Sequence, residues 1–282
     1  MGRDSWGQWS AAEAADWIRR PAADDDKYRR GVVGLFTGSA EYPGAAVLGV
    51  EAAHRTGVGM VRYAGPKAVR AAVLAHRPET VVQPGRVQAW VLGSGLDAGH
   101  RSFLTSGELQ HALASGLPVV LDAGALDLVG THTGPTVITP HAGELARLLS
   151  SREIDATVDD VRADPGAWAA RAARELRVVT LLKGATTYVC DPEGTRFALH
   201  ASTHWLAAAG TGDVLAGILG ALAATHHEIL STDATALTRI AATAVFVHGE
   251  AARLASDHVA GGPITALDLA GAIPRVVGSL LG

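Results

Sequence analysis

Gly210–Asp213, in the last third of the chain, combines groups that can hold a phosphate and move a proton. Its two glycines let a ligand come close to the backbone. The apolar run that follows predicts a buried helix, whose free N–H groups and dipole favour an anion at its first turn. A carboxylate adds negative charge there, which makes chemical sense if Asp213 takes the proton of a hydroxyl group being phosphorylated. The alternative is that Asp213 only caps the helix.

A second segment, Lys183–Thr187, follows an apolar strand. The ammonium group of Lys183, beside Gly184, is suited to meet a nucleotide phosphate. The backbone and hydroxyl groups of the next residues, Ala185, Thr186 and Thr187, can hold the rest of the nucleotide. The alternative is a solvated lysine at the end of a strand.

Three further loops with glycine follow predicted strands. Thr139–Glu144 contains His141, which either touches a substrate or is a surface group. Thr37–Ala46 looks like a phosphate-binding loop, but it lacks the lysine of a Walker A loop and has no Gly-x-Gly-x-x-Gly fingerprint. Gly93–Asp97 either lets a ligand approach the backbone or forms a plain tight turn.

Other kinds of site are not indicated by the sequence. No cluster of metal-ligating residues stands out, so magnesium would have to arrive with the nucleotide. His226 and His227 are adjacent and would diverge on a helix. There is no Ser/His/Asp or Cys/His signature of a nucleophilic enzyme.

Apolar strands without polar alternation, separated by helices, predict a parallel sheet covered by helices on both faces. In such sheets, ligands bind at the carboxyl ends of the strands. The expected strands are 32–37, 58–64, 89–92, 118–121, 136–139 and 178–182, with a β-hairpin of 186–190 and 195–200 around a type I turn. The expected helices are 44–56, 67–75, 103–115, 143–149, 168–176, 213–225, 235–255 and 266–278.

At the start of the chain, Ser10 and Glu13 form a capping-box pattern that predicts a helix over 10–20. A polar linker follows over 21–26. We therefore expect an N-terminal helix and linker over 1–26 and a single three-layer domain over 27–282.

The composition is that of a globular protein rather than of a nucleic-acid or membrane protein. The 282 residues are 48% hydrophobic, enough for a full core. A net charge of -4 argues against a nucleic-acid partner. The longest apolar run, Val214–Ala224, is too short to span a bilayer. Cys190 is the single cysteine, which excludes an intrachain disulfide and favours a reducing, cytoplasmic location.

Taken together and in this order, the segments resemble the ribokinase-like superfamily. More closely, the chain resembles the ADP/ATP-dependent NAD(P)H-hydrate dehydratases, which repair nicotinamide nucleotides. The resemblance runs from about Lys27 to Ile273. Gly210–Asp213 alone marks the superfamily, whereas Tyr42–Ala45 together with Thr139–Glu144 separates the dehydratases from the vitamin kinases. The resemblance implies a three-layer ribokinase-like α/β fold with a mostly parallel central sheet.

The resemblance also implies a reaction. ADP phosphorylates the hydroxyl group of hydrated NADH or NADPH (the S form), and AMP is released. Loss of phosphate then restores the reduced nicotinamide. The chemistry is reasonable, because hydroxide is a poor leaving group, phosphate is a good one, and the lone pair of the ring nitrogen can expel it. Mg²⁺ and ADP are the expected cofactor and co-substrate, and a homo-oligomer, with a tetramer as one form, is expected.

Position by position, the resemblance makes Asp213 the catalytic carboxylate. It assigns to the adenine nucleotide Lys183, Gly184, Ala185, Thr186, Thr187, Gly210, Thr211 and Gly212. It assigns to the hydrated dinucleotide Gly44, Ala45, Gly95, His141 and Asp213. Many bacterial relatives carry a fused epimerase domain, and here we expect the epimerase to be a separate protein that acts on the same substrate pool.

Three segments depart from the family pattern and concern substrate contacts. Gly93–Asp97 replaces Gly-Pro-Gly-Leu-Gly, Asp122–Asp127 replaces Asp-Ala-Asp-Ala-Leu-Asn, and Thr203–Trp205 replaces a small Asn-Pro-Gly-like stretch. Two other functions stay open at this point. One is a vitamin kinase acting on a hydroxymethylpyrimidine, thiazole or pyridoxal hydroxyl, and the other is a non-catalytic nucleotide-binding protein.

Overall fold

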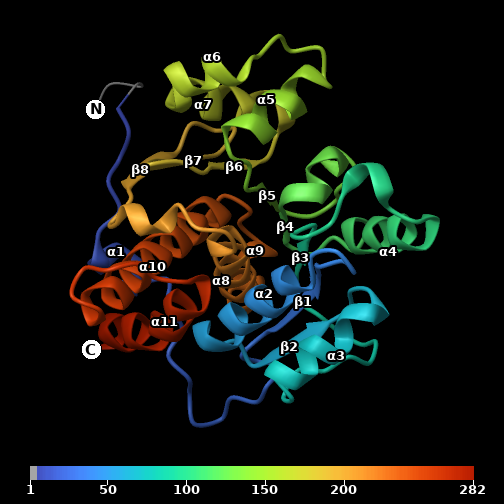
Figure 1. Cartoon of the computed structure of the whole chain (residues 1–282), viewed down its shortest axis with the longest axis vertical. Coiled ribbons are helices and arrows are strands. Elements are labelled where there is room, and N and C mark those ends of the chain that lie inside the picture. Colours follow the sequence, from blue (N-terminus) through green and yellow to red (C-terminus); the bar gives the residue numbers. More distant parts are fainter. Residues whose placement is uncertain (1–4) are drawn as a thin grey trace.

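The computed structural model describes residues 5–282, which fold into an eight-stranded sheet with helices on both faces (Figure 1). The strand order is β2-β1-β3-β4-β5-β6-β7-β8. The strands from β1 to β6 pair in parallel, β7 pairs antiparallel with β6, and β8 pairs antiparallel with β7. The predicted three-layer α/β fold is confirmed. The strands are β1 (Val32–Phe36), β2 (Met60–Tyr63), β3 (Ala89–Leu92), β4 (Val119–Leu121), β5 (Thr136–Ile138), β6 (Val179–Leu182), β7 (Thr186–Cys190) and β8 (Arg196–His200).

Successive side chains of each strand enter different cores, because they point to opposite faces of the sheet. Val91 packs on one face, in a core shared with most of the C-terminal helices. Leu92, the next residue, packs on the other face with α4. Both faces are covered, so the strands are apolar throughout rather than alternating. The helices are α1 (Ala11–Ala15), α2 (Pro43–Thr56), α3 (Lys67–His76), α4 (Phe103–Leu113), α5 (Ala142–Ser150), α6 (Val158–Ala163), α7 (Pro165–Leu176), α8 (Thr211–Thr225), α9 (His227–Leu230), α10 (Ala236–His258) and α11 (Ala266–Leu281).

Helix α8 is apolar on all sides because it is buried between the sheet and other helices. It contacts β1 and β3 on one side and α2 and α10 on the other. Gly217 permits the close approach of α2, since a Cβ atom at this position would lie 2.9 Å from the Cβ of Ala52. This packing fixes the direction of α8 and therefore the place of its first turn.

The predicted hairpin is confirmed, and its turn is tied to α10. The Asp191 carboxylate accepts hydrogen bonds from the backbone N–H groups of Gly194 and Thr195, each at 2.8 Å. Its other oxygen accepts a hydrogen bond from the Thr238 hydroxyl at 3.0 Å. One buried carboxylate thus holds the turn and attaches the antiparallel edge of the sheet to the helical layer.

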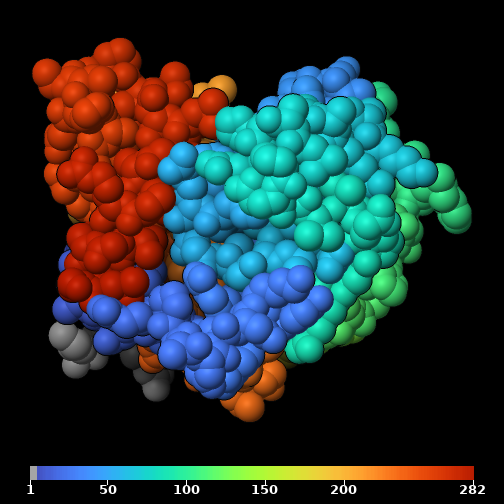
Figure 2. Space-filling view, turned by 90° about the horizontal axis from the view of Figure 1, so that it is seen from below, coloured from blue at the N-terminus to red at the C-terminus, as the bar shows by residue number. Residues whose placement is uncertain are grey.

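The N-terminal part of the chain lies across one side of the molecule, between the C-terminal helices and the region of α2 and α3 (Figure 2). Trp9 donates a hydrogen bond from Nε1 to the Thr243 hydroxyl of α10 at 3.1 Å. The capping box of Ser10 and Glu13 is present, but α1 ends at Ala15, earlier than expected. The first four residues of the predicted 1–26 segment lie outside the described residues.

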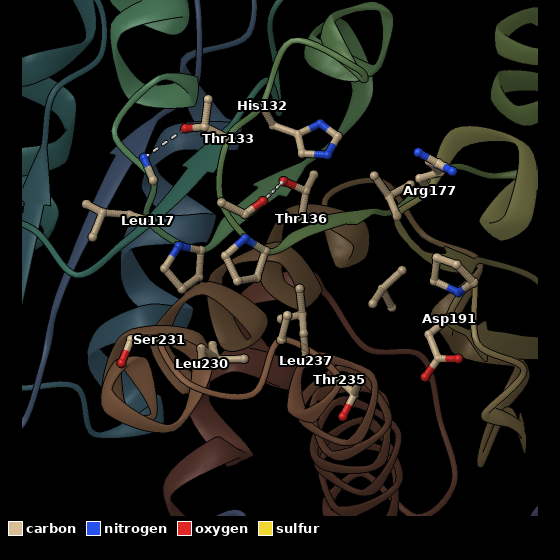
Figure 3. Close-up of a pocket in the computed structure, with 18 of the residues that line it drawn as sticks. Leu117, His132, Thr133, Thr136, Arg177, Asp191, Leu230, Ser231, Thr235 and Leu237 are labelled. Carbon is tan, nitrogen blue, oxygen red and sulfur yellow. Dashed lines mark hydrogen bonds between the residues drawn. The ribbon is translucent and has the colours of Figure 1, made fainter.

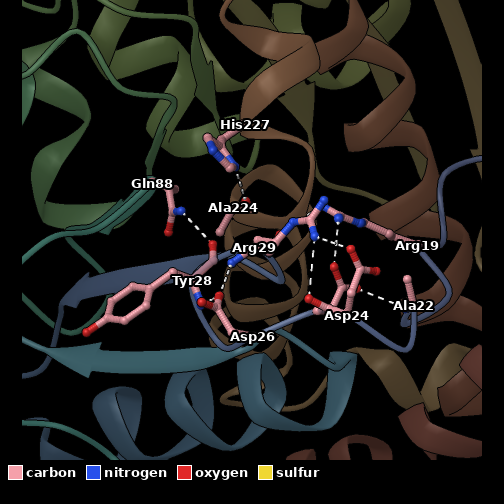
Figure 4. A network of polar contacts seen from close by, with 10 residues as sticks. Arg19, Ala22, Asp24, Asp26, Tyr28, Arg29, Gln88, Ala224 and His227 are labelled. Carbon is pink, nitrogen blue, oxygen red and sulfur yellow. Dashed lines mark hydrogen bonds and ion pairs between the residues drawn. The ribbon is translucent and has the colours of Figure 1, made fainter.

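The segment predicted as a polar linker, 21–26, is held by a network of polar contacts (Figure 4). Arg19 donates to the Asp25 carboxylate at 3.2 Å and to the backbone carbonyl of Arg29 at 2.8 Å. The side chain of Gln88, which precedes β3, donates to the carbonyl of Tyr28 at 2.8 Å. The acidic residues of this segment therefore form turns against the body of the protein.

Several short elements were not expected. Helices α6 and α9 fall where no element was predicted, and 3₁₀ turns cover Ala98–His100, Ala123–Leu128 and His204–Leu206. Helix α6 has a capping box of Thr157 and Asp160 and buries Val161, so it is stabilised by its cap and by packing rather than by a long apolar pattern. No helix within residues 5–282 is long and apolar enough to cross a membrane.

Candidate active site

The carboxyl ends of four neighbouring strands meet at a buried carboxylate, Asp122, which directly follows β4. Its Oδ1 accepts hydrogen bonds from the Thr139 hydroxyl at 2.7 Å and from the Lys183 ammonium at 2.9 Å. Its Oδ2 accepts one from the Ser94 hydroxyl at 2.9 Å. Ser94, Thr139 and Lys183 follow β3, β5 and β6. The loops selected from the sequence are thus brought to one edge of the sheet, as expected for a parallel α/β protein.

The first turn of α8 reaches this edge. Gly210 is the N-cap of the helix, with a φ angle of 89°. A side chain there would be strained, and its Cβ would lie 2.5 Å from Cδ1 of Leu48. Gly212 is the second helical residue, and a Cβ built on it would lie 3.5 Å from the Lys183 ammonium. The lysine therefore lies against the anion-binding end of the helix.

Asp213 is the third residue of α8 and does not cap it. The helix has no side-chain cap, and within residues 5–282 the Asp213 carboxylate has no hydrogen-bond partner. Burial raises the pKa of Asp213 to about 6; the negative charge of Asp122 adds to this, and Lys183 opposes it. The helix dipole at this position favours the ionised form, so burial outweighs it. The result is a free carboxylate whose pKa suits general base catalysis near neutral pH.

Lys183 and Asp122 stay charged despite their burial. Burial alone would lower the pKa of Lys183, but the charge of Asp122, followed by that of Glu144, raises it overall. Burial alone would raise the pKa of Asp122, but the charge and hydrogen bond of Lys183 lower it overall. The two groups form an ion pair whose carboxylate also accepts hydrogen bonds from Thr139 and Ser94, as buried ion pairs require.

A cavity of about 440 Å³ opens beside Lys183 and Gly212. The residues assigned to the adenine nucleotide that line it are Lys183, Gly184, Ala185, Thr187, Thr211 and Gly212. Leu199, Leu206, Leu215 and Val245 give it an apolar wall. Thr186 instead points its hydroxyl at Nδ1 of His200, 2.9 Å away. An apolar cavity next to a cation and a helix N-terminus is suited to a nucleotide with its base inside and its phosphates at the mouth.

A second cavity, of about 540 Å³, lies at the same edge of the sheet and is lined by Tyr42, Leu96, Ala123 and Glu144 among others. Gly95 lies near it with a φ angle of 68°, and a Cβ there would lie 2.5 Å from that of Ala45. Gly44 has open space around it. The loops after β1 and β3 thus pack backbone against backbone beside this cavity.

His141 has a structural role that the sequence did not reveal. It is the N-cap of α5, where its Nδ1 accepts hydrogen bonds from the backbone N–H groups of Gly143 at 3.0 Å and Glu144 at 3.3 Å. Because Nδ1 accepts, Nε2 carries the proton in the neutral ring. The ring is exposed and lines the 440 Å³ cavity, and its Nε2 lies 3.6 Å from the Glu144 carboxylate.

Two residues of the site were missed in the prediction of site residues. Asp122 has the same position after an apolar strand as the other loops, and this was a usable signal. His248 gave no signal, since it is a single histidine in an alanine-rich helix. It lines the 440 Å³ cavity from α10, and its Nε2 lies 2.9 Å from the carbonyl oxygen of Thr211. Burial lowers the pKa of His248 to about 4, so the ring is neutral and donates to that carbonyl.

The site offers no metal cage of its own. Among residues 5–282 there is no group of three His, Cys, Asp or Glu side chains that could hold an ion. Asp122 is already occupied by Lys183, Thr139 and Ser94. This donor set fits a magnesium ion that is held mainly by nucleotide phosphates and water.

A larger cavity, of about 640 Å³, lies at the opposite edge of the sheet (Figure 3). It is lined by Pro118, Thr136 and Val178, which stand at the amino ends of β4, β5 and β6, and by His132 and Arg177. The lining hydroxyls of Thr133 and Thr136 are bonded to nearby backbone. Gly116, Gly134 and Thr235, the N-cap of α10, also line it.

The fold and the carboxyl-edge site define a ribokinase-like α/β protein with an anion site and a free carboxylate at one helix N-terminus. The family model for NAD(P)H-hydrate dehydratases matches residues 33–275, and the chain belongs to this family. This confirms the resemblance found in the sequence.

Relatives and solved structures agree with the family. A bifunctional NAD(P)H-hydrate repair enzyme of Mycobacterium tuberculosis is 44% identical over 227 residues, which are 75% of this chain and 45% of that protein. An ADP-dependent (S)-NAD(P)H-hydrate dehydratase of Xanthomonas campestris is 29% identical over 283 residues, 92% of each chain. A crystal structure of the ADP/ATP-dependent NAD(P)H-hydrate dehydratase of Bacillus subtilis, co-crystallised with ATP and Mg²⁺, superposes with a TM-score of 0.84. It shares 26% identity and covers 98% of this chain and 99% of its own. The chain spans about half the length of the bifunctional relatives.

Proposed function

We propose that the chain is an ADP-dependent dehydratase of hydrated NADH and NADPH. The observation that carries this proposal is the Asp213 carboxylate. It is free of hydrogen bonds within residues 5–282, has a pKa of about 6, and lies beside Lys183 at the N-terminus of α8. A protein that only binds nucleotide has no use for a free carboxylate next to a phosphate.

In the first step, Asp213 takes the proton of the hydroxyl group on the hydrated nicotinamide ring. The hydroxyl oxygen attacks the β-phosphate of ADP, and AMP leaves. In the second step the C–O bond breaks as the lone pair of the ring nitrogen expels inorganic phosphate, which leaves an iminium ion. Loss of a proton from the adjacent ring carbon to solvent then forms the carbon–carbon double bond of the reduced nicotinamide. Magnesium bound to the nucleotide phosphates supplies charge neutralisation.

The backbone N–H groups of Thr211 and Gly212 and the Lys183 ammonium hold the phosphoryl group during transfer. These donors are fixed before substrate binds, since Lys183 is already paired with Asp122 and Thr211 is held by His248. Preorganised donors of this kind stabilise the transferred charge without having to reorganise.

The two cavities at the carboxyl edge accommodate two substrates. The apolar cavity of about 440 Å³ takes the adenosine of ADP. The cavity of about 540 Å³ takes the hydrated dinucleotide, with the loops that carry Gly44, Ala45 and Gly95 beside it. His141 lines the first cavity and would meet the dinucleotide only from that side. Gly212, the neighbour of Asp213, lines the first cavity, and we infer that the Asp213 carboxylate reaches the hydroxyl group of the second substrate from there.

One assay tests the function. Purified protein is mixed with hydrated NADPH, ADP and Mg²⁺, and the return of reduced-nicotinamide absorbance is followed together with AMP and phosphate. We expect one AMP and one phosphate for each NADPH, and faster turnover with ADP than with ATP at equal concentration. Accumulation of a phosphorylated alcohol from a vitamin substrate, without reduced nicotinamide, would instead identify a vitamin kinase. No turnover of either kind would leave a nucleotide-binding protein.

We also propose that the chain acts as a homo-oligomer in the cytoplasm, a tetramer being one form. Light scattering coupled to gel filtration measures the mass of the assembly directly, and a mass equal to the 29.0 kDa chain would contradict this proposal.

A further inference from the structure

The Asp122 carboxylate is anchored from three directions. Thr139, Lys183 and Ser94 donate to it at 2.7, 2.9 and 2.9 Å, and each comes from the end of a different strand. The Asp122 side chain is 4% exposed. Its donors occupy three lone-pair directions, so the carboxylate is fixed in position and has little freedom to take up another ligand.

Lys183 is held by Asp122 at a single point. Its side chain is 23% exposed and carries four rotatable bonds, so without a partner the ammonium would be free to move. The pair distance of 2.9 Å places the ammonium next to Gly212, where a Cβ atom would lie 3.5 Å from Nζ. The ammonium therefore stands between Asp122 and the first turn of α8.

Two other carboxylates act on Lys183. Their charges, from Glu144 of α5 and Asp213 of α8, attract the ammonium, but neither forms an ion pair with it. Glu144 already accepts a hydrogen bond from the backbone N–H of His141 at 2.8 Å, whereas Asp213 has no hydrogen-bond partner within residues 5–282. We therefore expect a lysine released from Asp122 to pair with Asp213. That pairing would neutralise the base and withdraw the cation from the phosphate.

We propose that Asp122 is a positioning residue: it holds the Lys183 ammonium beside Gly212, facing the phosphate site, and so keeps Lys183 from pairing with the catalytic Asp213. The roles of Lys183 and Asp213 rest on the proposed function. The placement itself rests on the three hydrogen bonds to Asp122 and on the contact between Lys183 and Gly212.

The charged groups around Asp213 determine what the pairing does to its titration. Asp122 from the end of β4 raises the pKa of Asp213, and Lys183 from the end of β6 lowers it. Glu144 of α5 acts on Lys183. His248 of α10 is neutral above pH 5 because burial lowers its pKa to about 4. His141, the N-cap of α5, is exposed and bonded to its own helix. The Asp122–Lys183 pair is thus the main adjustable charge near Asp213.

Two substitutions should move the titration of Asp213 in opposite directions. Asp122→Asn removes a negative charge and frees Lys183, so the pKa of Asp213 should fall by about one unit or more. Lys183→Met removes the positive charge and leaves that of Asp122 unopposed, so the pKa of Asp213 should rise above 6. The measurement is the carboxyl ¹³C chemical shift of Asp213 against pH in the unliganded full-length chain.

Activity gives the second readout. The acidic limb of kcat/KM, which reports the base in the free enzyme, should move to lower pH in Asp122→Asn, with a fall of roughly 10-fold or more at pH 7. Asp122→Glu keeps the charge and should leave the acidic limb near that of the wild type, while a displaced ammonium raises KM for ADP. Thr238→Val is the matched control, since it removes a buried hydroxyl from another carboxylate, Asp191, at 3.0 Å. It should lower the melting temperature without moving the pKa of Asp213.

An unchanged pKa of Asp213 in folded Asp122→Asn overturns the proposal, as does a shift of the same sign in both variants. If Asp122→Asn does not fold, Lys183→Met is the deciding variant. The absence of an upward shift in the pKa of Asp213 in Lys183→Met then overturns the proposal. Opposite shifts follow from the removed charges alone, so the double variant Asp122→Asn/Lys183→Met isolates the positioning. A lysine that moves towards Asp213 in Asp122→Asn makes the pKa shift of Asp213 in the double variant more positive than the sum of the two single shifts, and additive shifts overturn the proposal. Non-additive shifts in a protein that dehydrates no hydrated NADPH would support the positioning by Asp122 and reject the proposed function. The failures of the two proposals are therefore distinguishable.

Discussion

At the scale of single residues, Asp213 is a carboxylate in a place that disfavours its charge. Burial and the charge of Asp122 raise its pKa to about 6, above the ordinary value of 3.8. A carboxyl group whose pKa is raised by folding binds its proton more tightly in the folded state. The free energy of unfolding therefore falls as pH rises from about 4 to 6, and at neutral pH the ionised group lowers the stability of the protein.

Asp213→Asn should consequently separate catalysis from stability. Turnover should fall by roughly 10²–10⁴, the usual share of general base catalysis. The melting temperature at pH 7 should rise by a few degrees, because the charge is gone and asparagine is similar in size. Affinity for adenine nucleotide should be kept or slightly increased. Turnover assays, thermal melts and a nucleotide titration measure the three quantities.

A role of Asp213 in helix capping would give a different pattern. Asparagine is itself a good cap, so a capping residue would change stability by tenths of a kcal/mol and leave the rate alone. Near-normal turnover in Asp213→Asn would remove this residue from the mechanism. The melt at pH 4, where the carboxyl group is protonated in the folded protein, is the internal control, since there the two proteins should differ least.

The sequence identified the residues whose chemistry is visible in their type, and missed those whose role depends on contacts. Asp213 and Lys183 were found because each stands beside glycine at an expected strand or helix end. Asp122 and His248 were not assigned to the site, since their roles come from partners 61 and 37 residues away in the sequence. The capping of α5 by His141 was also missed, because Ser, Thr, Asp and Asn are the usual N-caps and histidine is not one of them.

At the scale of elements, the first turn of α8 depends on the backbone of Gly210. Its φ angle of 89° lies in the left-handed region, and a Cβ atom would lie 2.5 Å from Cδ1 of Leu48. Gly210→Ala should therefore destabilise the protein by about 1–3 kcal/mol and displace the N–H groups that face the nucleotide. We expect weaker AMP binding by calorimetry and a lower melting temperature.

Gly271→Ala is a matched control for this substitution. Gly271 lies inside α11, its φ angle is not in the left-handed region, and nothing lies within 4 Å of a Cβ built on it. Alanine is a better helix former than glycine, so this variant should be more stable by about 0.5–1 kcal/mol, with unchanged AMP affinity. Equal effects of the two substitutions would show that neither stability nor AMP binding depends on the left-handed backbone conformation of Gly210.

The order and type of the main elements could be predicted because each carries its own pattern. The buried parallel strands are apolar runs, and the boundary of β3 was predicted as Ala89–Leu92, where it lies. Helix α9, of four residues, has no such pattern and forms only where the chain turns between α8 and α10. The 3₁₀ turn of Ala123–Leu128 packs Ala125 and Leu126 into a core, and no local sequence pattern predicts this turn.

At the scale of the whole molecule, an ion cluster joins α2 to the end of α3 and makes stability depend on pH. Glu51 of α2 pairs with Arg55 and Arg77 and lies 3.4 Å from His76. Burial alone would raise the pKa of Glu51, but the hydrogen bonds from Arg77 and Arg55 outweigh this effect and lower the pKa to about 2. A carboxyl group with a lowered folded pKa stabilises the fold above its unfolded value of 4.5, and this contribution is lost as pH falls towards 2.

Glu51→Gln should therefore be less stable than the wild type at pH 7 by about 1–3 kcal/mol, because two arginines lose a charged partner. The difference between the two proteins should shrink as pH falls from 4.5 to 2. Urea unfolding at a series of pH values measures it. A difference that does not depend on pH would mean that Glu51 acts by packing rather than by its charge.

Ligand binding should stabilise the molecule as a whole, because the nucleotide site is built from distant parts of the chain. Lys183 follows β6, Gly212 lies in the first turn of α8, and His248 belongs to α10, so a nucleotide that contacts all three joins the sheet to the helical layer. Ligand at about 100 times its dissociation constant adds roughly 2.7 kcal/mol to the free energy of unfolding.

AMP or ADP should thus raise the melting temperature, and Lys183→Met should weaken the shift by lowering affinity for the phosphates. AMP should raise the melting temperature more than adenosine does, since adenosine fits the apolar cavity but has no phosphate for Lys183 to bind. If no adenine nucleotide shifts the melting temperature of folded protein, the nucleotide does not bind at this edge of the sheet.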